Sequence, residues 1–143
     1  MNAAVRILLL ILPLTANAAE RCQQEEGHKS FSLGYFDEAY SMLAPCIRAP
    51  DVTGETLYRL ATFLAYRKQG MHLDPEKKRR VVIGLYTQSA FRGYEHGILA
   101  LVRELEREAI ANVGAHTLAA CLRKAVEIVA DSQRASARSC FEN

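Results

Sequence analysis

The sequence predicts an all-α protein whose antiparallel helical hairpins stack as a short α-solenoid or close into a compact bundle. Three observations lead to this prediction. Apolar residues recur at helical spacing, glycines separate successive apolar stripes, and no segment shows the sustained alternation of a strand. The clearest unit runs from Asp74 to Val102, where two stripes meet at Gly93. Continuing this pattern along the chain gives about seven helices.

Residues 1–18 have the features of a secretory signal peptide. Arg6 supplies a positive charge, residues 7–12 form an unbroken apolar run, and Ala16-Asn17-Ala18 is the small-x-small pattern that a signal peptidase needs. The alternative is a membrane anchor, but the run is far shorter than the ~20 apolar residues that span a bilayer. We therefore expect a periplasmic or secreted protein. Its mature part, residues 19–143, would be a single helical domain with no membrane span.

The composition of the mature part excludes some classes of function. Without Arg6, its charges nearly balance, because the whole chain has 18 basic and 16 acidic residues. Proteins that bind nucleic acids usually carry a strong basic excess, so we expect no nucleic-acid partner. Half of the chain is apolar, which favours a folded domain over disorder.

Four cysteines in an exported chain predict two disulfides. They are Cys22, Cys46, Cys121 and Cys140. Of the three pairings that four cysteines allow, hairpin geometry favours Cys22–Cys46 and Cys121–Cys140. The first pair is centred on Gly34 and the second on residues 130–131, so each pair would lie level across an antiparallel hairpin. A metal or redox site is the alternative, but no C-x-x-C spacing is present.

The first hairpin is predicted from residue 20 to residue 47. We expect one helix from about residue 20 to Leu33 and another from Phe36 to Ile47, with Gly34 at the bend. Pro45 should distort the second helix or end it early, because it lacks an amide hydrogen and clashes with the preceding turn.

The middle of the chain predicts three more helices. After a loop at residues 49–54, a stripe indicates a helix that Gly70 would stop. Asp74 can then cap a helix with Pro75 in its first position, and Gly93 can end that helix in a left-handed turn before the next one. The residues of the three stripes are Leu57, Leu60, Ala61, Leu64 and Ala65; Val82, Leu85, Tyr86 and Ala90; and Ile98, Leu101, Val102 and Leu105.

The last part predicts another hairpin. We expect a turn at Asn112-Val113-Gly114 and then a helix capped by Thr117. Ser132 would cap a short last helix. The stripe of the first of these helices is Leu118, Cys121, Leu122, Ala125 and Val129.

Residues from Gly34 to Leu105 resemble known helical repeats. The segment from Gly34 to Pro45 looks like the first half of a tetratricopeptide hairpin, and the segment from Gly54 to Val102 is similar to the longer Sel-like repeats. The matching positions are Gly34, Phe36, Glu38, Ala39, Leu43 and Pro45, then Leu60, Ala61, Gly70, Asp74, Leu85, Tyr86, Ser89, Ala90, Gly93 and Leu101. Tyr58 and Gly97 depart from the pattern, since the family has a small residue and an alanine there. The final hairpin matches poorly, which leaves the compact bundle open. The resemblance implies stacked hairpins that hold another protein or peptide.

The sequence contains no recognisable catalytic or metal-binding motif. None of the four histidines has a second histidine at the i+4 spacing of a zinc helix, and no nucleophile elbow or phosphate-binding loop occurs. The carboxylate pairs are adjacent in sequence, so their side chains diverge on a helix. We expect no enzyme, no cofactor and no metal.

Basic and tyrosine side chains off the apolar stripes are the candidate partner-binding residues. These candidates are Arg59, Arg67, Lys78, Arg79 and Tyr94. Tyrosine and arginine are favoured at interfaces because they bury a large area and keep a polar tip. The basic run from Lys77 to Arg80 lies near a helix start, where it opposes the helix dipole, so it suggests an acidic partner. The alternative is that each tyrosine packs between helices with its hydroxyl in water.

Three classes of function are consistent with these features. The sequence favours a non-catalytic exported module that binds another protein or peptide, as a scaffold or an adaptor. The first alternative is a periplasmic inhibitor, such as an immunity protein that neutralises an antibacterial toxin. The second is an enzyme of a class whose residues are not recognised.

Overall fold

The computed structural model describes residues 21–108, 113–127 and 130–142, and all regular structure in these ranges is helical. The α-helices are α1 (Gln24–Ser32), α2 (Phe36–Leu43), α3 (Gly54–Tyr66), α4 (Pro75–Phe91), α5 (Glu95–Glu108), α6 (Val113–Val126) and α7 (Ala130–Ser139), and the 3-10 helices are η2 (Ala44–Arg48) and η3 (Lys68–Gly70). The predicted all-α class is therefore confirmed. None of the helices in these ranges is both long and apolar enough to cross a bilayer.

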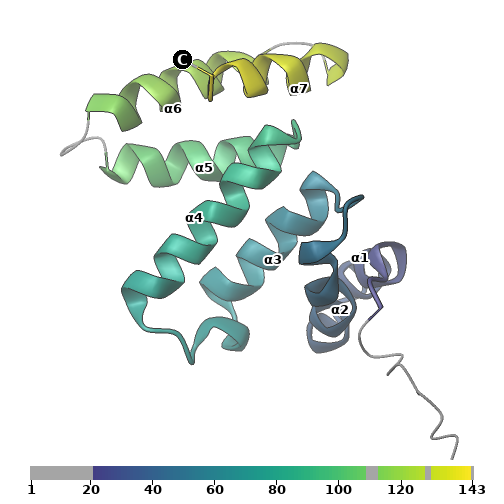
Figure 1. Ribbon diagram of the computed structural model, residues 1–143. Coiled ribbons are helices and arrows are strands. Elements are labelled where there is room, and N and C mark those ends of the chain that lie inside the picture. The colour runs from purple at the N-terminus through teal and green to yellow at the C-terminus, as the bar shows by residue number, and fades with distance from the viewer. Residues whose placement is uncertain (1–20, 109–112, 128–129, 143) are drawn as a thin grey trace, which may run out of the picture.

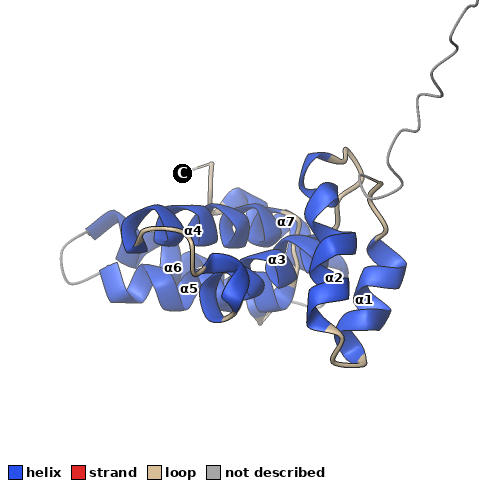
Figure 2. Cartoon of the chain, turned by 90° about the horizontal axis from the view of Figure 1, so that it is seen from below, coloured by secondary structure: helices blue, strands red, loops and turns tan. Residues whose placement is uncertain are grey.

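The helices pack mainly against their neighbours in the sequence. Figure 1 shows α3 and α4 side by side, α5 next to α4, and α6 and α7 on the far side of α5. The α1–α2 hairpin stands across the other helices at one end of the molecule, as Figure 2 shows. This is the predicted stacking of helical hairpins, and α7 also reaches back to α4.

Both predicted disulfides are present. Cys22 bonds to Cys46, with their Cα atoms 4.5 Å apart, and Cys121 bonds to Cys140, with their Cα atoms 5.8 Å apart. The first joins the segment before α1 to η2, and the second joins α6 to the end of α7. Each therefore closes one end of the stack.

The predicted turns between α1 and α2 and between α4 and α5 are also confirmed. Gly34 and Gly93 have φ values of 84° and 75°, which is the left-handed conformation that glycine adopts without strain. The Asp74 carboxylate accepts a hydrogen bond of 2.9 Å from the backbone N–H of Lys77 and so caps α4. As expected from Pro45, the second helix ends early, at Leu43, and the chain continues as a 3-10 helix.

The core contains most of the predicted stripes together with residues outside them, of which Phe63 is the largest. Phe63 is fully buried, and its ring packs edge-on against the rings of Phe31, Phe36 and Tyr40. The α1–α2 hairpin is thus fixed to α3 by an aromatic cluster. Leu64, which the stripe placed in the core, is only half-buried.

Several predicted helix ends are wrong. The first helix begins at Gln24, although the part of its predicted range up to residue 20 lies outside the described residues. Gly70 ends η3 and not α3, which already ends at Tyr66.

The predicted turn and caps of the last hairpin are also wrong. Gly114 and Thr117 lie inside α6 and Ser132 lies inside α7, so none of them is at a turn or a cap. A glycine ends a helix only where the chain needs a positive φ, and Gly114 keeps a helical one. Asn112 and Val129 lie outside the described residues.

Candidate functional site

The structure places the five candidate binding residues in separate environments. Lys78 and Arg79 lie together on the first half of α4, and Arg67 follows the end of α3. Arg59 lies within α3, and Tyr94 lies in the turn before α5. Lys78 and Arg79 line the same groove.

Arg59 is half-buried and joins α3 to α1. Its guanidinium donates a hydrogen bond of 2.6 Å to the Glu55 carboxylate and one of 3.0 Å to the backbone carbonyl of His28. The guanidinium carbon also lies 4.3 Å from the centre of the Phe31 ring. These contacts hold the α1–α2 hairpin in place, so Arg59 contributes to the structure.

Tyr94 packs in a second aromatic cluster. Its ring lies 5.6 Å from the ring of Tyr58 and 5.5 Å from the ring of His96, measured between centroids. Tyr58 is at the centre of this cluster and also contacts Tyr86 and His96. Burial raises the pKa of Tyr94 and raises the pKa of Tyr86 to about 12. Tyr94 thus packs between helices, which was the alternative to a binding role.

Arg67 covers the Phe36 ring, with its guanidinium carbon 3.5 Å from the ring centre. The neighbouring Asp37 carboxylate accepts hydrogen bonds from Lys68 at 2.7 Å and from Gln69 at 3.0 Å. The hydrogen bond from Lys68 is the largest cause that lowers the pKa of Asp37. The positive charge of this surface is therefore partly neutralised.

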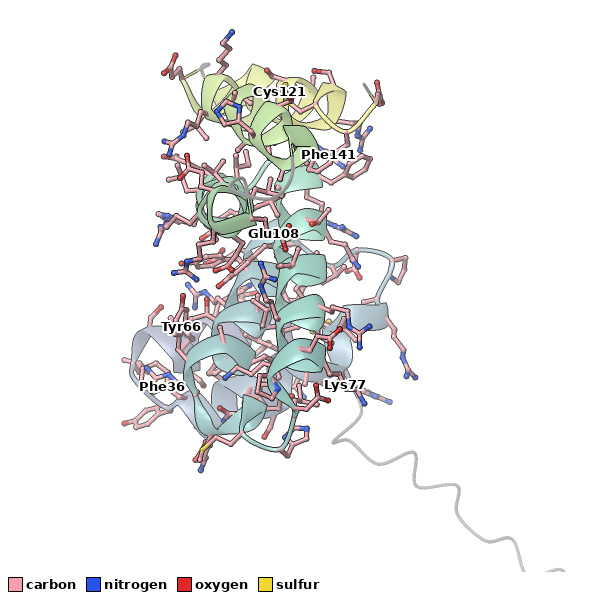
Figure 3. The ribbon with its side chains drawn as sticks, turned by 90° about the vertical axis from the view of Figure 1, so that its left-hand side faces the viewer. Phe36, Tyr66, Lys77, Glu108, Cys121 and Phe141 are labelled. Carbon is pink, nitrogen blue, oxygen red and sulfur yellow. A yellow bond between two sulfur atoms is a disulfide. The ribbon has the colours of Figure 1, made fainter. Side chains whose placement is uncertain are left out.

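Lys78 and Arg79 line a groove that we call the α3–α5 groove, with a volume of about 630 Å³. It lies where the end of α3, the η3 connection, the start of α4 and the end of α5 meet. Its lining residues are Ala65, Tyr66, Gly70, Met71, Leu73, Pro75, Lys78, Arg79, Val82, Glu104 and Arg107. Figure 3 looks toward this side of the molecule, with Tyr66 on one side of α4, Glu108 beside its middle and Lys77 near its start.

The groove combines exposed apolar side chains with an unpaired cation. Tyr66 is 70% exposed and Met71 is 80% exposed, although both belong to types that bury large apolar area. Arg79 forms an ion pair of 2.7 Å with Glu108, and Arg107 forms one of 2.9 Å with Glu104.

Lys78 is half-buried in the same groove. In the described part of the chain no carboxylate lies within 4.0 Å of its ammonium group. The positive charge of Lys78 therefore has no carboxylate partner among the described residues.

Comparison of the chain with protein families, curated proteins and solved structures finds no match. Function is therefore inferred from the geometry of the groove.

Of the groove residues, Lys78 and Arg79 are among the candidates predicted from the sequence, whereas Arg107, Met71 and Leu73 are not. Met71 and Leu73 belong to the connection between α3 and α4, which has no helical periodicity to reveal its orientation. Arg107 belongs to a mixed run of charges that is typical of a solvated helix face. In the sequence, the feature that could indicate this groove is a pair of large apolar residues, Met71 and Leu73, that follow Gly70 in a short connection between helices.

His28 is a half-buried titratable residue between α1 and α3. Its Nε2 atom lies 3.0 Å from the Thr56 hydroxyl, and its Nδ1 atom lies 3.9 Å from the Glu55 carboxylate. Burial is the largest cause that lowers the pKa of His28, opposed by Glu55. The Thr56 hydroxyl in turn donates to the side-chain oxygen of Gln24 at 2.7 Å, so the network joins α1 to α3.

Among the described residues, no three histidine, cysteine or acidic side chains come close enough to hold a metal ion.

Proposed function

We propose that this protein is a non-catalytic binding module, acting in the periplasm or outside the cell, that holds a segment of another protein in the α3–α5 groove. The observation that carries the proposal is the position of exposed Tyr66 and Met71 beside the unpaired ammonium group of Lys78. Large apolar residues that gather at the surface are typical of interaction sites.

The chemistry of the groove defines the segment that fits it. An apolar side chain of the partner would cover Tyr66 and Met71, and a carboxylate one or two residues away would pair with Lys78. Arg79 and Arg107 are already neutralised by Glu108 and Glu104, so they contribute less attraction. The expected ligand is therefore a short segment with one or two large apolar residues and an acidic residue.

The rigidity of the groove supports binding without a large rearrangement. α4 begins with a side-chain cap from Asp74 and a proline, and its inner side is buried through Val82 and Leu85. A Cβ atom at Gly70 would lie 1.8 Å from the backbone oxygen of Leu64, so the connection lies directly on the end of α3. The groove wall is thus fixed before the ligand arrives, which lowers the entropy cost of binding.

The test is selection of displayed random peptides on the purified, oxidised protein, followed by affinity measurement with fluorescently labelled peptides. We expect selected peptides to combine apolar and acidic residues. Tyr66→Ser should weaken their binding at least about tenfold, as truncation of an interface anchor does. Tyr35→Ser is the matched control, because Tyr35 is 60% exposed and lies at the start of α2, away from the groove.

Equal binding to the Tyr66 and Tyr35 variants would place the interface outside the α3–α5 groove. Peptides without acidic residues would contradict the role given to Lys78.

A further inference from the structure

A second cleft lies at the other end of α3, between the loop before that helix, the end of α4, and α7. Its volume is about 490 Å³. α3 has 13 residues, so its two ends are about 20 Å apart and this cleft is distinct from the α3–α5 groove. Figure 1 shows α7 lying over the end of α4. Three arginines line the cleft, Arg92, Arg134 and Arg138, and we call it the arginine cleft.

Arg92 is held in place by the backbone. Its Nε atom donates a hydrogen bond of 2.9 Å to the carbonyl oxygen of Val52, and one Nη atom donates to the carbonyl oxygen of Gln88 at 3.2 Å. Both acceptors are uncharged, so the positive charge of this side chain is not neutralised. The contact with Val52 also fixes the loop that forms one wall of the cleft.

Arg138 is oriented by an aromatic ring. Its guanidinium carbon lies 4.4 Å from the centre of the Phe91 ring, and that ring also packs against Phe141, which Figure 3 labels near the end of α4. Stacking on a ring leaves the N–H edge of a guanidinium available for an acceptor. The Nε atom of Arg138 is buried, and no described residue accepts a hydrogen bond from it. A buried donor without an acceptor is costly, so this guanidinium is not fully satisfied in the unbound protein.

Arg134 is exposed and lies on the same helix as Arg138. A Cβ atom at Gly93 would lie 2.5 Å from the Cα atom of Arg134, so the α7 backbone lies directly on the turn between α4 and α5. The Cys121–Cys140 disulfide further ties α7 to α6. The position of the arginine backbone is therefore well fixed, while its side chain extends into solvent.

The charge of the cleft is unbalanced. Among the side chains that the structure describes, no carboxylate lies within 4.0 Å of any of the three guanidinium groups. Of the described residues that line the cleft, Asp51 is the one that is acidic, so these residues carry a formal excess of two positive charges. The amino-terminal end of α3, whose dipole is positive, begins at Gly54 in the same wall.

We propose that the arginine cleft binds a dianionic phosphate group. Two net positive charges match a dianion, and planar guanidinium groups bind phosphate oxygens through paired N–H donors. A single carboxylate would neutralise only half of the excess. The phosphate group could belong to a small soluble molecule or to a lipid headgroup, and the two sources are separated by experiment.

The experiment is isothermal titration of the oxidised protein with inorganic phosphate at low ionic strength. We expect saturable binding, and Arg134→Gln should weaken it about tenfold or more, as loss of a charged hydrogen bond does. Arg103→Gln is the matched control, because Arg103 is exposed on α5 and lines neither cleft, and it should change the affinity by about twofold at most. Asp51→Asn should strengthen binding, because it removes the opposing charge while keeping all three arginines.

A second arm uses sedimentation with phosphatidylcholine vesicles that do or do not contain phosphatidic acid. Binding to inorganic phosphate shows that the cleft binds a phosphate group without a lipid. Binding only to the vesicles with phosphatidic acid, lost in Arg134→Gln, assigns the site to a lipid-borne phosphate.

Absence of binding in both arms would overturn the proposal. Weaker phosphate binding by Asp51→Asn, or equal affinities of Arg134→Gln and Arg103→Gln, would also overturn it. Thermal melts of each variant show whether it is folded.

Discussion

The hydroxyl of Ser89 on α4 donates a hydrogen bond of 2.6 Å to the backbone carbonyl of Gly54 at the start of α3. Ser89 is fully buried, and a Cβ atom at Gly97 on α5 would lie only 2.1 Å from its hydroxyl oxygen. The three helices thus cross at one point, where small residues allow the backbones to approach. Residue 97 is a glycine at a crossing where a Cβ atom does not fit.

Gly97→Ala should therefore destabilise the protein. The added methyl group must displace Ser89 or separate α4 from α5, and overpacking of this kind costs about 1–3 kcal/mol. Gly84→Ala is the matched control, because Gly84 is an exposed glycine inside α4 with open space around it, so alanine should stabilise the helix by about 0.5–1 kcal/mol. Urea denaturation of the two variants measures both effects. A Gly97 variant as stable as the wild type would contradict the close crossing.

Phe63 should be more important for stability than its neighbour Leu64. Phe63 is fully buried among Phe31, Phe36 and Tyr40, so Phe63→Ala should cost about 3–5 kcal/mol. Leu64 is half-buried, so Leu64→Ala should cost less. Thermal melts of the two variants compare these costs, and an equal loss would show that the apolar stripe and not the aromatic cluster forms the core.

Stability should fall as the pH is lowered through the range in which His28 titrates. Burial lowers the pKa of His28 below its ordinary value of 6.5, so the unfolded chain takes up a proton before the folded one. The stabilisation is complete above pH 6.5 and is lost as the pH falls toward the lower folded pKa. Asp37, whose pKa is also lowered, contributes only at more acidic pH, because its ordinary value is 3.8.

The free energy of unfolding measured between pH 7 and pH 5 tests this prediction. His28→Gln should flatten the pH dependence over that range, whereas His116→Gln, a change at an exposed residue of α6, should leave it as it is. An unaltered slope in the His28 variant would show that this histidine titrates normally in the folded protein.

Lys78 should control the rate at which an acidic segment associates with the α3–α5 groove. Lys78→Glu should slow association with the peptides selected on the wild type, and added salt should reduce the difference, because attraction between exposed charges is screened. Lys124→Glu is the matched control, since Lys124 is exposed on α6 and does not line the groove. Stopped-flow fluorescence measures both rates. Identical rates for the two variants would remove Lys78 from the binding surface.

The fold could be predicted from the sequence wherever local chemistry decides it. The cap at Asp74, the turns at Gly34 and Gly93 and the two disulfides depend on residue type and spacing, and these predictions are confirmed, whereas the caps at Thr117 and Ser132 are not. The predicted turn at Gly114 is wrong because a glycine is compatible with a turn and with a helix, and the packing of α6 on α5 decides between them.

The candidate site was less predictable, because it depends on which side chains already have contacts within the folded protein. Arg59 and Tyr94 lie off the apolar stripes, as a binding residue would, yet Arg59 donates to the His28 carbonyl on α1 and Tyr94 packs on Tyr58 of α3. Met71 lies in a short connection without periodicity, so only the structure shows that it lines the same groove as Lys78.

The methyl groups of the methionines give the most direct test of the central claim, that the α3–α5 groove holds the partner segment. Besides Met1, the chain contains only Met42 and Met71. Met71 is 80% exposed in the groove, whereas Met42 is half-buried on α2. In a protein with carbon-13-labelled methionine methyl groups, a selected peptide should shift the Met71 signal and leave the Met42 signal in place. Saturating binding that moves Met42, or that moves neither signal, would contradict the account.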